Sequence, residues 1–175
     1  MIITDPGIQK VGLVEKVGKL INQDIQVEVY SDVVPEPPLD NVEKCAQYVK
    51  KGGFDLLIGL GGGSPIDVTK VVAVLATSDQ PMSSLFGVNM ISGPSLPTIM
   101  IPTTAGTGSE VTPIAIITDT AEKLKRGMVS PCLYPSVAIC DPLLTMAMPM
   151  SITAATGMDA LTHAVEAYTS VNASP

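Results

Sequence analysis

Aromatic side chains are scarce in this sequence. Its 175 residues include no Trp, two Phe and four Tyr, together 3% of the chain. The core must therefore be built from Val, Ile, Leu, Met and Ala, which suits a parallel sheet covered by helices. Hydrophobic residues make up 46% of the chain and charged residues 15%. This composition is typical of a globular protein, and the length is that of one domain.

Positive charge is also limited, with 10 Lys and Arg against 17 Asp and Glu and a net charge of −7. The only basic cluster is "KLKR" at 123–126, so neither nucleic acid nor an anionic membrane is expected as a partner. Three cysteines, Cys45, Cys132 and Cys140, are too few and too scattered for a disulfide framework or a zinc knuckle. They predict reduced thiols in a cytoplasmic protein. The N-terminus "MIITDPG" does not resemble a secretion signal, and "VVAVLA" is too short to span a bilayer.

Short apolar runs alternate with longer amphipathic segments along the chain. Asp40 and Ser64 are expected as helix N-caps, with Pro65 at the first helical position and a break near Gly12. The alternation predicts an α/β fold with a doubly wound, mainly parallel sheet. The expected strands are 1–4, 25–30, 54–61, 97–101, 114–118 and 136–140, and the expected helices are 8–21, 40–53, 64–77 and 151–168.

The glycine-rich segment "GLGGGSPID" at 59–67 joins a buried strand to the start of a helix. Amide groups at a helix N-terminus favour a phosphate, and glycines let its oxygens approach the backbone. The segment departs from the dinucleotide fingerprint G-x-G-x-x-G, because Ser64 stands at the place of the third glycine. Ser64 and Asp67 would also serve a helix start that binds nothing. Both interpretations remain open on the pattern alone.

A second polar loop, "PTTAGTGSE" at 102–110, also follows a strand. Its hydroxyls and amides could bind a ribose, a phosphate or an amide, although an ordinary polar turn is the simpler interpretation. Both loops leave the carboxyl ends of strands, so we expect them to face one crevice.

The only histidine, His163, lies four residues after Asp159 in "GMDALTHAVEAY" at 157–168. On a helix the two side chains meet on one face, and Glu166 is spaced to orient the imidazole. A carboxylate with an imidazole suits Fe²⁺ or Zn²⁺, whereas a surface hydrogen bond is the simpler interpretation of the spacing.

Taken together, five segments resemble the iron-containing (group III) alcohol dehydrogenases. They occur in the family's order across nearly the whole chain. The segments are "ITD" at 3–5, "IGLGGGSPIDVTK" at 58–70, "IPTTAGTGSEVT" at 101–112, "DP" at 141–142 and "TAATGMDALTHAVEAY" at 153–168.

The resemblance implies a Rossmann-like dinucleotide-binding α/β domain at 1–148 and the first helix of an all-helical, metal-binding domain at 149–175. It implies Asp159 and His163 as ligands of Fe²⁺, with Zn²⁺ as the alternative, and further histidines from later helices. The chain would then be an N-terminal fragment with an incomplete metal site, lacking also the strand that precedes "MIITD" in the family.

The resemblance also assigns residues to an NAD site. Asp5 would contact the adenosine ribose and favour NAD over NADP. The pyrophosphate would lie at Gly62, Gly63, Ser64 and Asp67, and the nicotinamide side at Thr103, Thr104 and Thr107, while Lys125 would reach the cofactor.

One departure from the family concerns Glu36 in "PEP", where the family often has Asn. A carboxylate there disfavours an anionic cofactor. The implied reaction is hydride transfer between the nicotinamide and a small alcohol or aldehyde, with the metal as Lewis acid. No general base is identified.

Two other interpretations remain open. The fold resemblance extends to glycerol dehydrogenases, 3-dehydroquinate synthase-like lyases and a nicotinamide transhydrogenase. The chain alone could instead be a nucleotide-binding module without catalysis. An apolar face formed by Ile152, Ala155, Leu161 and Val165 predicts a homo-oligomer or aggregation if nothing covers it.

Overall fold

A five-stranded parallel sheet forms the centre of the computed structural model, which describes residues 1–171 and 173. Its strand order is β2-β1-β3-β5-β8, and every neighbouring pair is parallel. This arrangement confirms the expected doubly wound α/β fold. The strands are β1 (Ile2–Ile3), β2 (Val29–Tyr30), β3 (Leu57–Gly61), β5 (Thr98–Pro102) and β8 (Val137–Ala138).

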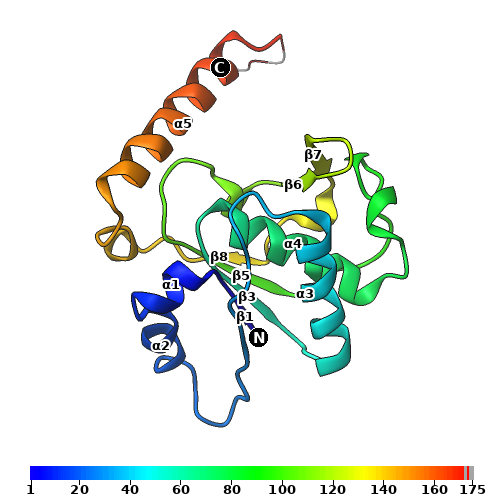
Figure 1. The fold of residues 1–175 in the computed structure, drawn as a ribbon, viewed down its shortest axis with the longest axis vertical. Coiled ribbons are helices and arrows are strands. Elements are labelled where there is room, and N and C mark those ends of the chain that lie inside the picture. Colours follow the sequence, from blue (N-terminus) through cyan, green and yellow to red (C-terminus); the bar gives the residue numbers. More distant parts are fainter. Residues whose placement is uncertain (172, 174–175) are drawn as a thin grey trace.

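Helices cover both faces of this sheet (Figure 1). Ile3 and Leu57 belong to the core under α3 and α4, whereas Ile2 and Leu60 pack with residues of α1 and α2 on the other face. Successive strand residues point to opposite faces, so both layers are apolar. The helices are α1 (Pro6–Lys10), α2 (Leu13–Gly18), α3 (Leu39–Gly52), α4 (Gly63–Thr77) and α5 (Met150–Thr169).

A second sheet of three strands was not predicted. Its order is β4-β7-β6, with β6 antiparallel to β7 and β4 parallel to β7. The expected strand at 114–118 lies in this sheet and not in the main one. The basic segment "KLKR" forms part of its β7 partner. These strands are β4 (Gly87–Val88), β6 (Ile114–Asp119) and β7 (Leu124–Val129).

The predicted break near Gly12 is confirmed, because this glycine has a φ of +77° between α1 and α2. Two predicted N-caps are wrong. Helix α3 is capped by Pro38, which leaves Asp40 in its first turn, and α4 is capped by Gly62. An extended glycine at this position lets the helix start before Ser64. Pro65 is then the third helical residue, where the missing N–H still costs no intrahelical bond.

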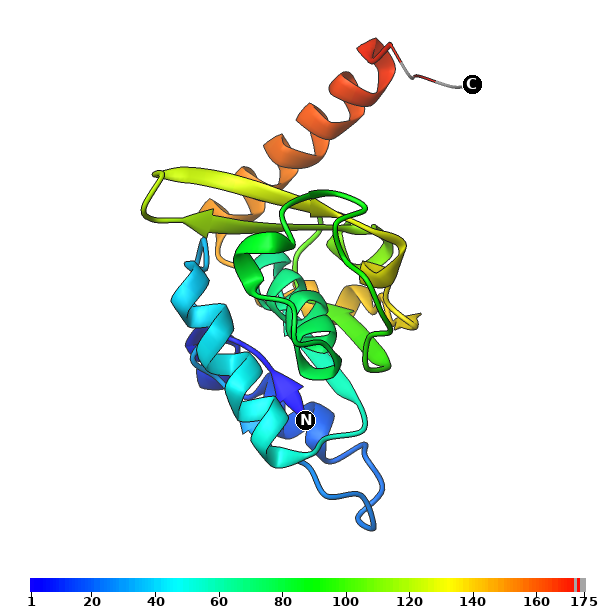
Figure 2. The same cartoon turned by 90° about the vertical axis from the view of Figure 1, so that its right-hand side faces the viewer.

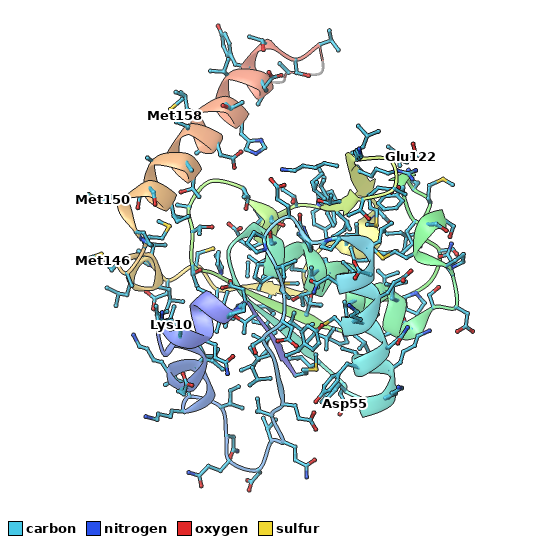
Figure 3. All side chains as sticks on the ribbon, in the orientation of Figure 1. Lys10, Asp55, Glu122, Met146, Met150 and Met158 are labelled. Carbon is cyan, nitrogen blue, oxygen red and sulfur yellow. The ribbon has the colours of Figure 1, made fainter. Side chains whose placement is uncertain are left out.

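The last helix, α5, extends away from the two sheets (Figure 2). Its observed bounds confirm the helix predicted at 151–168, and none of its 20 residues is buried in the described chain. Met146, Met150 and Met158 point outward in Figure 3. Across residues 1–171 and 173, no helix is both long and apolar enough to cross a membrane.

Candidate functional site

The candidate site lies where β1, β3 and β5 end. These three strands are neighbours and parallel, so the loops that follow them meet at one edge of the sheet. The Thr4 hydroxyl donates to the Leu60 carbonyl at 2.7 Å, and the Thr103 amide donates to the Gly61 carbonyl at 2.9 Å. The predicted common crevice for the two loops is therefore present in the structure.

The glycine turn between β3 and α4 is shaped by its neighbours. Gly61 has a φ of +149°, and a Cβ there would lie 2.7 Å from Cγ of Pro65. A Cβ on Gly62 would lie 3.3 Å from Cγ2 of Thr104. A Cβ on Gly63 would lie 3.0 Å from Cγ2 of Thr107. The segment that approaches these glycines is thus the polar loop at 102–110, called the threonine loop below. Its packing requires small residues in the turn whether or not a ligand binds.

The start of α4 nevertheless retains the chemistry of an anion site. No side chain caps α4 in the described part of the protein, and Pro65 has no amide proton to offer. The amides of Gly63 and Ser64 are therefore available at the positive end of a 15-residue helix. Such a helix start binds phosphate groups well.

Two pockets meet at this helix start, with volumes of about 560 and 670 Å³. Gly63 and Ser64 line both of them. The first pocket is mainly apolar and also contains Asp5, Thr103 and Thr104, whereas the second has more polar and charged residues in its lining. The second pocket is lined by Glu36, Asp67, Thr107, Ser109, Lys125, Asp159 and His163, among others. Every predicted site residue therefore lines one of the two pockets.

Asp5 begins α1 as its N-cap. Its Oδ1 accepts hydrogen bonds from the amides of Gly7 at 2.8 Å and Ile8 at 3.0 Å. Among the described residues, no donor bonds to its Oδ2, which lies 3.3 Å from where a Cβ on Gly61 would stand. One carboxylate oxygen is therefore used by the fold, and the other is free next to the glycine turn.

Asp67 and Lys70 form a buried ion pair behind the second pocket, with 3.4 Å between Oδ1 and Nζ. Burial raises the pKa of the Asp67 carboxyl, an effect opposed by the Lys70 charge and by hydrogen bonds from Ser109 and Ile116. Burial lowers the pKa of Lys70, and the Asp67 charge opposes that shift. The charge of each partner thus opposes the pKa shift that burial causes in the other.

Lys125 lies at the mouth of the second pocket and is already paired. Its Nζ is 2.6 Å from Oε1 of Glu36, and both side chains are exposed to solvent. Glu36 adopts a left-handed backbone with a φ of +50°. The carboxylate that departs from the family pattern therefore contacts the lysine predicted to reach the cofactor.

Asp159 and His163 meet on one face of α5 as predicted, with 3.7 Å between Oδ2 and Nε2. No hydrogen bond joins Glu166 to the imidazole in the described chain, so its expected orienting contact is absent. Residues 1–171 and 173 contain no group of three or more His, Cys, Asp or Glu side chains that could hold a metal. The structure thus brings two candidate ligands together, and both line the second pocket.

Helix α5 reaches the site through the threonine loop. A Cβ on Gly106 would lie 2.6 Å from the backbone oxygen of Thr156, so the loop and the helix touch at a glycine. This contact was not predicted from the sequence. Neither was the apolar wall of the first pocket, which includes Val34, Leu144 and Ile152. Ile152 was predicted only as part of an exposed apolar helix face, and no motif marks Val34 or Leu144 as pocket residues.

Comparison with known proteins gives one consistent result. The family model described as iron-containing alcohol dehydrogenase matches residues 1–142. A long-chain-alcohol dehydrogenase from Geobacillus thermodenitrificans is 50% identical over 100% of this chain and 45% of its own length. A crystal structure of 1,3-propanediol oxidoreductase has a TM-score of 0.93 at 40% identity, covering 99% of this chain and 46% of that one.

A further similar structure is a sulfoacetaldehyde reductase from Bifidobacterium kashiwanohense in complex with NAD⁺. It is 34% identical with a TM-score of 0.88, over 99% of this chain and 46% of that one. The chain thus spans a little under half the length of the relatives it matches. The fold, the order of the motifs and these matches agree that the chain belongs to the iron-containing alcohol dehydrogenase family.

Proposed function

We propose that this chain is the nucleotide-binding half of an NAD-dependent, metal-dependent alcohol dehydrogenase. The observation that carries the proposal is the pair of pockets sharing Gly63 and Ser64 at the start of α4. A dinucleotide has two nucleoside halves joined by a pyrophosphate, and the helix start suits the pyrophosphate. Each pocket has a volume typical of a small-molecule site.

In this proposal the adenosine half occupies the first pocket and Asp5 selects the cofactor. The free Oδ2 accepts a hydrogen bond from the ribose 2′-hydroxyl and repels a 2′-phosphate, so NAD binds more tightly than NADP. The amides of Gly62, Gly63 and Ser64 bind the pyrophosphate. A related reductase whose structure contains NAD⁺ supports this assignment.

The nicotinamide half then occupies the second pocket, beside Thr107 and Lys125 and facing α5. Thr103 and Thr104 line the first pocket and orient the pyrophosphate that links the two halves of the cofactor. The bound nicotinamide accepts hydride from a small alcohol or donates it to an aldehyde. The residues of this chain fix its position and exclude water from one side.

Asp159 and His163 are proposed as two ligands of a divalent metal, Fe²⁺ or alternatively Zn²⁺. The donor set fits, since a carboxylate and an imidazole at 3.7 Å match the ligands that such ions take. When bound, the metal polarises the substrate oxygen. A catalytic site of this kind takes at least three protein ligands, so two donors from this chain form only part of it.

The proposed division of the chain follows from these roles. Residues 1–148 form the dinucleotide-binding domain, and 149–175 begin the helical metal-binding domain, of which 172, 174 and 175 lie outside the described residues. No residue of α5 is buried, which supports its assignment to a separate unit. The 175-residue chain by itself should therefore bind nucleotide without turning over an alcohol.

Isothermal calorimetry of the 175-residue chain with NADH and with NADPH tests the cofactor assignment. The Asp5→Ser variant keeps an oxygen that can cap α1 but removes the charge. We expect it to reduce the preference for NADH over NADPH by about tenfold, because the 2′-phosphate is no longer repelled. Asp24→Ser is the matched control, since Asp24 is exposed and lies outside both pockets.

Each outcome has a distinct meaning. Tight NADH binding that Asp5→Ser weakens and Asp24→Ser does not would support the assigned site. Absence of heat with either nucleotide, from a chain whose circular dichroism is that of a folded protein, would refute it. Equal affinity for NADH and NADPH in the unmodified chain would refute the role of Asp5 alone.

A further inference from the structure

The buried side of α4 carries two charges that no ligand role explains. Lys70 is only 1% exposed and Asp67 9%, and the pair lies near the start of the helix. Buried charges are costly unless each finds a full set of partners. Their partners therefore indicate what the pair does.

The ammonium group of Lys70 donates hydrogen bonds to backbone carbonyl groups. It donates to the carbonyl oxygens of Ser109 at 2.8 Å, Thr112 at 3.3 Å and Ile114 at 2.5 Å. An ammonium group has three protons, and these three acceptors match them. All three belong to the segment that leads from the threonine loop into β6. Lys70 thus fixes the path of this segment from beneath.

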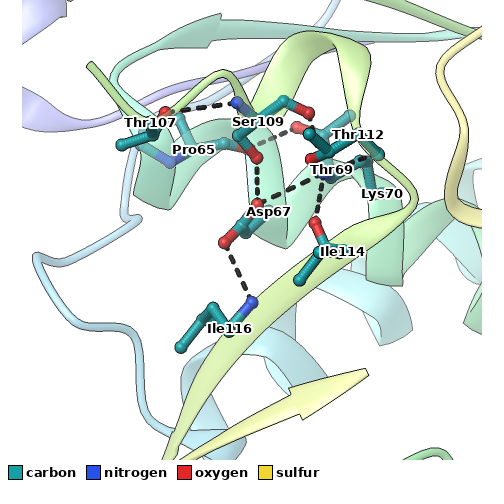
Figure 4. Close-up of polar contacts among 9 residues, drawn as sticks. All are labelled: Pro65, Asp67, Thr69, Lys70, Thr107, Ser109, Thr112, Ile114 and Ile116. Atoms are coloured by element: carbon teal, nitrogen blue, oxygen red, sulfur yellow. Dashed lines mark hydrogen bonds and ion pairs between the residues drawn. The ribbon is translucent and has the colours of Figure 1, made fainter. Parts of the chain in front are cut away.

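Asp67 holds the same segment through different groups. Its Oδ1 accepts from the Ser109 hydroxyl and its Oδ2 accepts from the Ile116 amide at 2.9 Å. Figure 4 shows the two side chains of α4 reaching across to residues on both sides of Thr112. Both carboxylate oxygens are occupied, so Asp67 has little capacity left for a sugar or an amide, and its charge disfavours a phosphate.

Ser109 connects Asp67 to the rest of the threonine loop. Its amide donates to Oγ1 of Thr107 at 3.3 Å, and the Thr107 methyl group packs against Gly63 in the glycine turn. A series of direct contacts therefore runs from Asp67 through Ser109 and Thr107 to Gly63. It begins and ends on α4, at residues only four positions apart.

We propose that Asp67 and Lys70 are positioning residues that hold the threonine loop at a fixed distance from the glycine turn. The proposal rests on the proposed function, because the two loops form the two sides of the nucleotide site. Asp67 was predicted from the family resemblance to be part of the pyrophosphate loop. In this inference it acts through Ser109, and the threonine loop makes the contact with the nicotinamide half.

Removing Lys70 is a poor test, because it leaves three carbonyl groups and a carboxylate buried without their partner. Ser109→Ala is milder, since it deletes one hydroxyl and no charge. Asp67→Asn keeps the size of the side chain and removes the charge. Asp40→Asn makes the same chemical change in the exposed Asp40–Lys44 pair of α3 and serves as the control.

The measurement compares NADH with AMP as ligands of the same variant. AMP reaches only the first pocket and the glycine turn, whereas NADH also extends into the second pocket beside Thr107. We expect Ser109→Ala and Asp67→Asn to weaken NADH binding about tenfold and AMP binding less than about twofold. The double variant should lose no more than the larger single loss, because both changes break one chain of contacts.

A general loss of stability would instead weaken the binding of NADH and the binding of AMP equally, and that result would overturn the inference. Additive losses in the double variant would show that Asp67 does not act through Ser109. Amide hydrogen exchange at 103–109 in the chain without nucleotide provides a readout independent of binding. If the unmodified chain binds neither ligand, the proposed function fails, while unchanged exchange in both variants would overturn this inference separately.

Discussion

The Nζ atom of Lys125 lies 2.6 Å from Oε1 of Glu36, across the mouth of the second pocket. This pair joins the loop before α3 to strand β7, which are far apart in the sequence. A lysine at this position can contact the phosphates of a nucleotide only if it leaves Glu36 or shares it. Cofactor affinity should therefore depend on the carboxylate as well as on the lysine.

Replacement of Glu36 by Asn should tighten NADH binding about threefold at low salt, because it removes a negative charge and frees Lys125. The free energy of unfolding should change by less than about 0.5 kcal/mol. Asn relieves the left-handed backbone, whereas loss of an exposed ion pair costs a comparable amount. Calorimetry and chemical denaturation measure the two effects.

The Glu36→Gln variant separates charge from backbone conformation, since Gln tolerates positive φ no better than Glu. It should bind NADH as tightly as the Glu36→Asn variant does, but without relieving the left-handed backbone strain. If neither variant changes the dissociation constant of NADH at low salt, the Glu36–Lys125 pair has no influence on the cofactor.

The contact between Gly106 and Thr156 predicts opposite effects for two glycine substitutions. A Cβ on Gly106 would lie 2.6 Å from a backbone oxygen, so Gly106→Ala must displace α5. Gly157 lies inside α5, and a Cβ there would meet no neighbouring atom within 4 Å, so Gly157→Ala should stabilise the helix by about 0.5–1 kcal/mol. Amide exchange in α5 should become faster in the first variant and slower in the second.

Acid should weaken the hairpin of β6 and β7 through Asp119. Hydrogen bonds from the Glu122 amide, from Arg126 and from the Ala121 amide hold the pKa of Asp119 below its usual value. The folded state binds this proton less tightly than the unfolded state does. The contribution of Asp119 to stability is therefore complete above the unfolded value of about 4 and is lost as pH falls through the lower folded value.

The Asp119→Asn variant should consequently unfold at a lower temperature than the unmodified chain at pH 7, and the difference should shrink below about pH 4. Thermal unfolding at a series of pH values measures this difference. A gap in melting temperature that stays constant down to about pH 3 would contradict the assignment to the Asp119 charge.

The exposed apolar face of α5 predicts self-association of the 175-residue chain. Leu161 is 56% exposed and Val165 53%, and Ile152 is 44% exposed on the same helix. Burying such side chains against another chain is favourable by about 1.5–3 kcal/mol each. Size-exclusion chromatography over a dilution series should show larger species, and Leu161→Lys should reduce them. A clean monomer at every concentration would contradict this prediction.

The main sheet could be predicted because its signals are local. Apolar runs such as "LLIGLG" stand directly before glycine turns, and helix starts and ends carry their own residues. The second sheet could not, because the sequence of β7, "LKRGMV", has little apolar character and its pairing with β6 is not marked by any turn motif. Lys70 looks like a solvent-exposed helix residue in "DVTKVV", and its burial depends on the carbonyl of Ser109, 39 positions away.

The site shows the same division between local and distant information. Motifs identified the glycine turn, the threonine loop and the Asp159–His163 pair, since each is continuous in sequence. The Glu36–Lys125 pair spans 89 positions and depends on how the loop before α3 meets strand β7. Likewise, the glycine-rich sequence suggested that a ligand approaches the backbone closely. In the structure, Thr104 packs against Gly62 and Thr107 packs against Gly63.

Helix α5 contacts the threonine loop at Thr156, so the angle of the helix at this contact sets where its far end lies. A helix of 20 residues is about 30 Å long, and His163 stands about 10 Å beyond Thr156. A rotation of about 10° there moves the imidazole by roughly 2 Å relative to the glycine turn, while the spacing between Asp159 and His163 stays the same. Metal coordination tolerates errors of only about 0.2 Å. The angle of α5 therefore determines how far an ion bound to Asp159 and His163 would lie from a nucleotide bound at the start of α4.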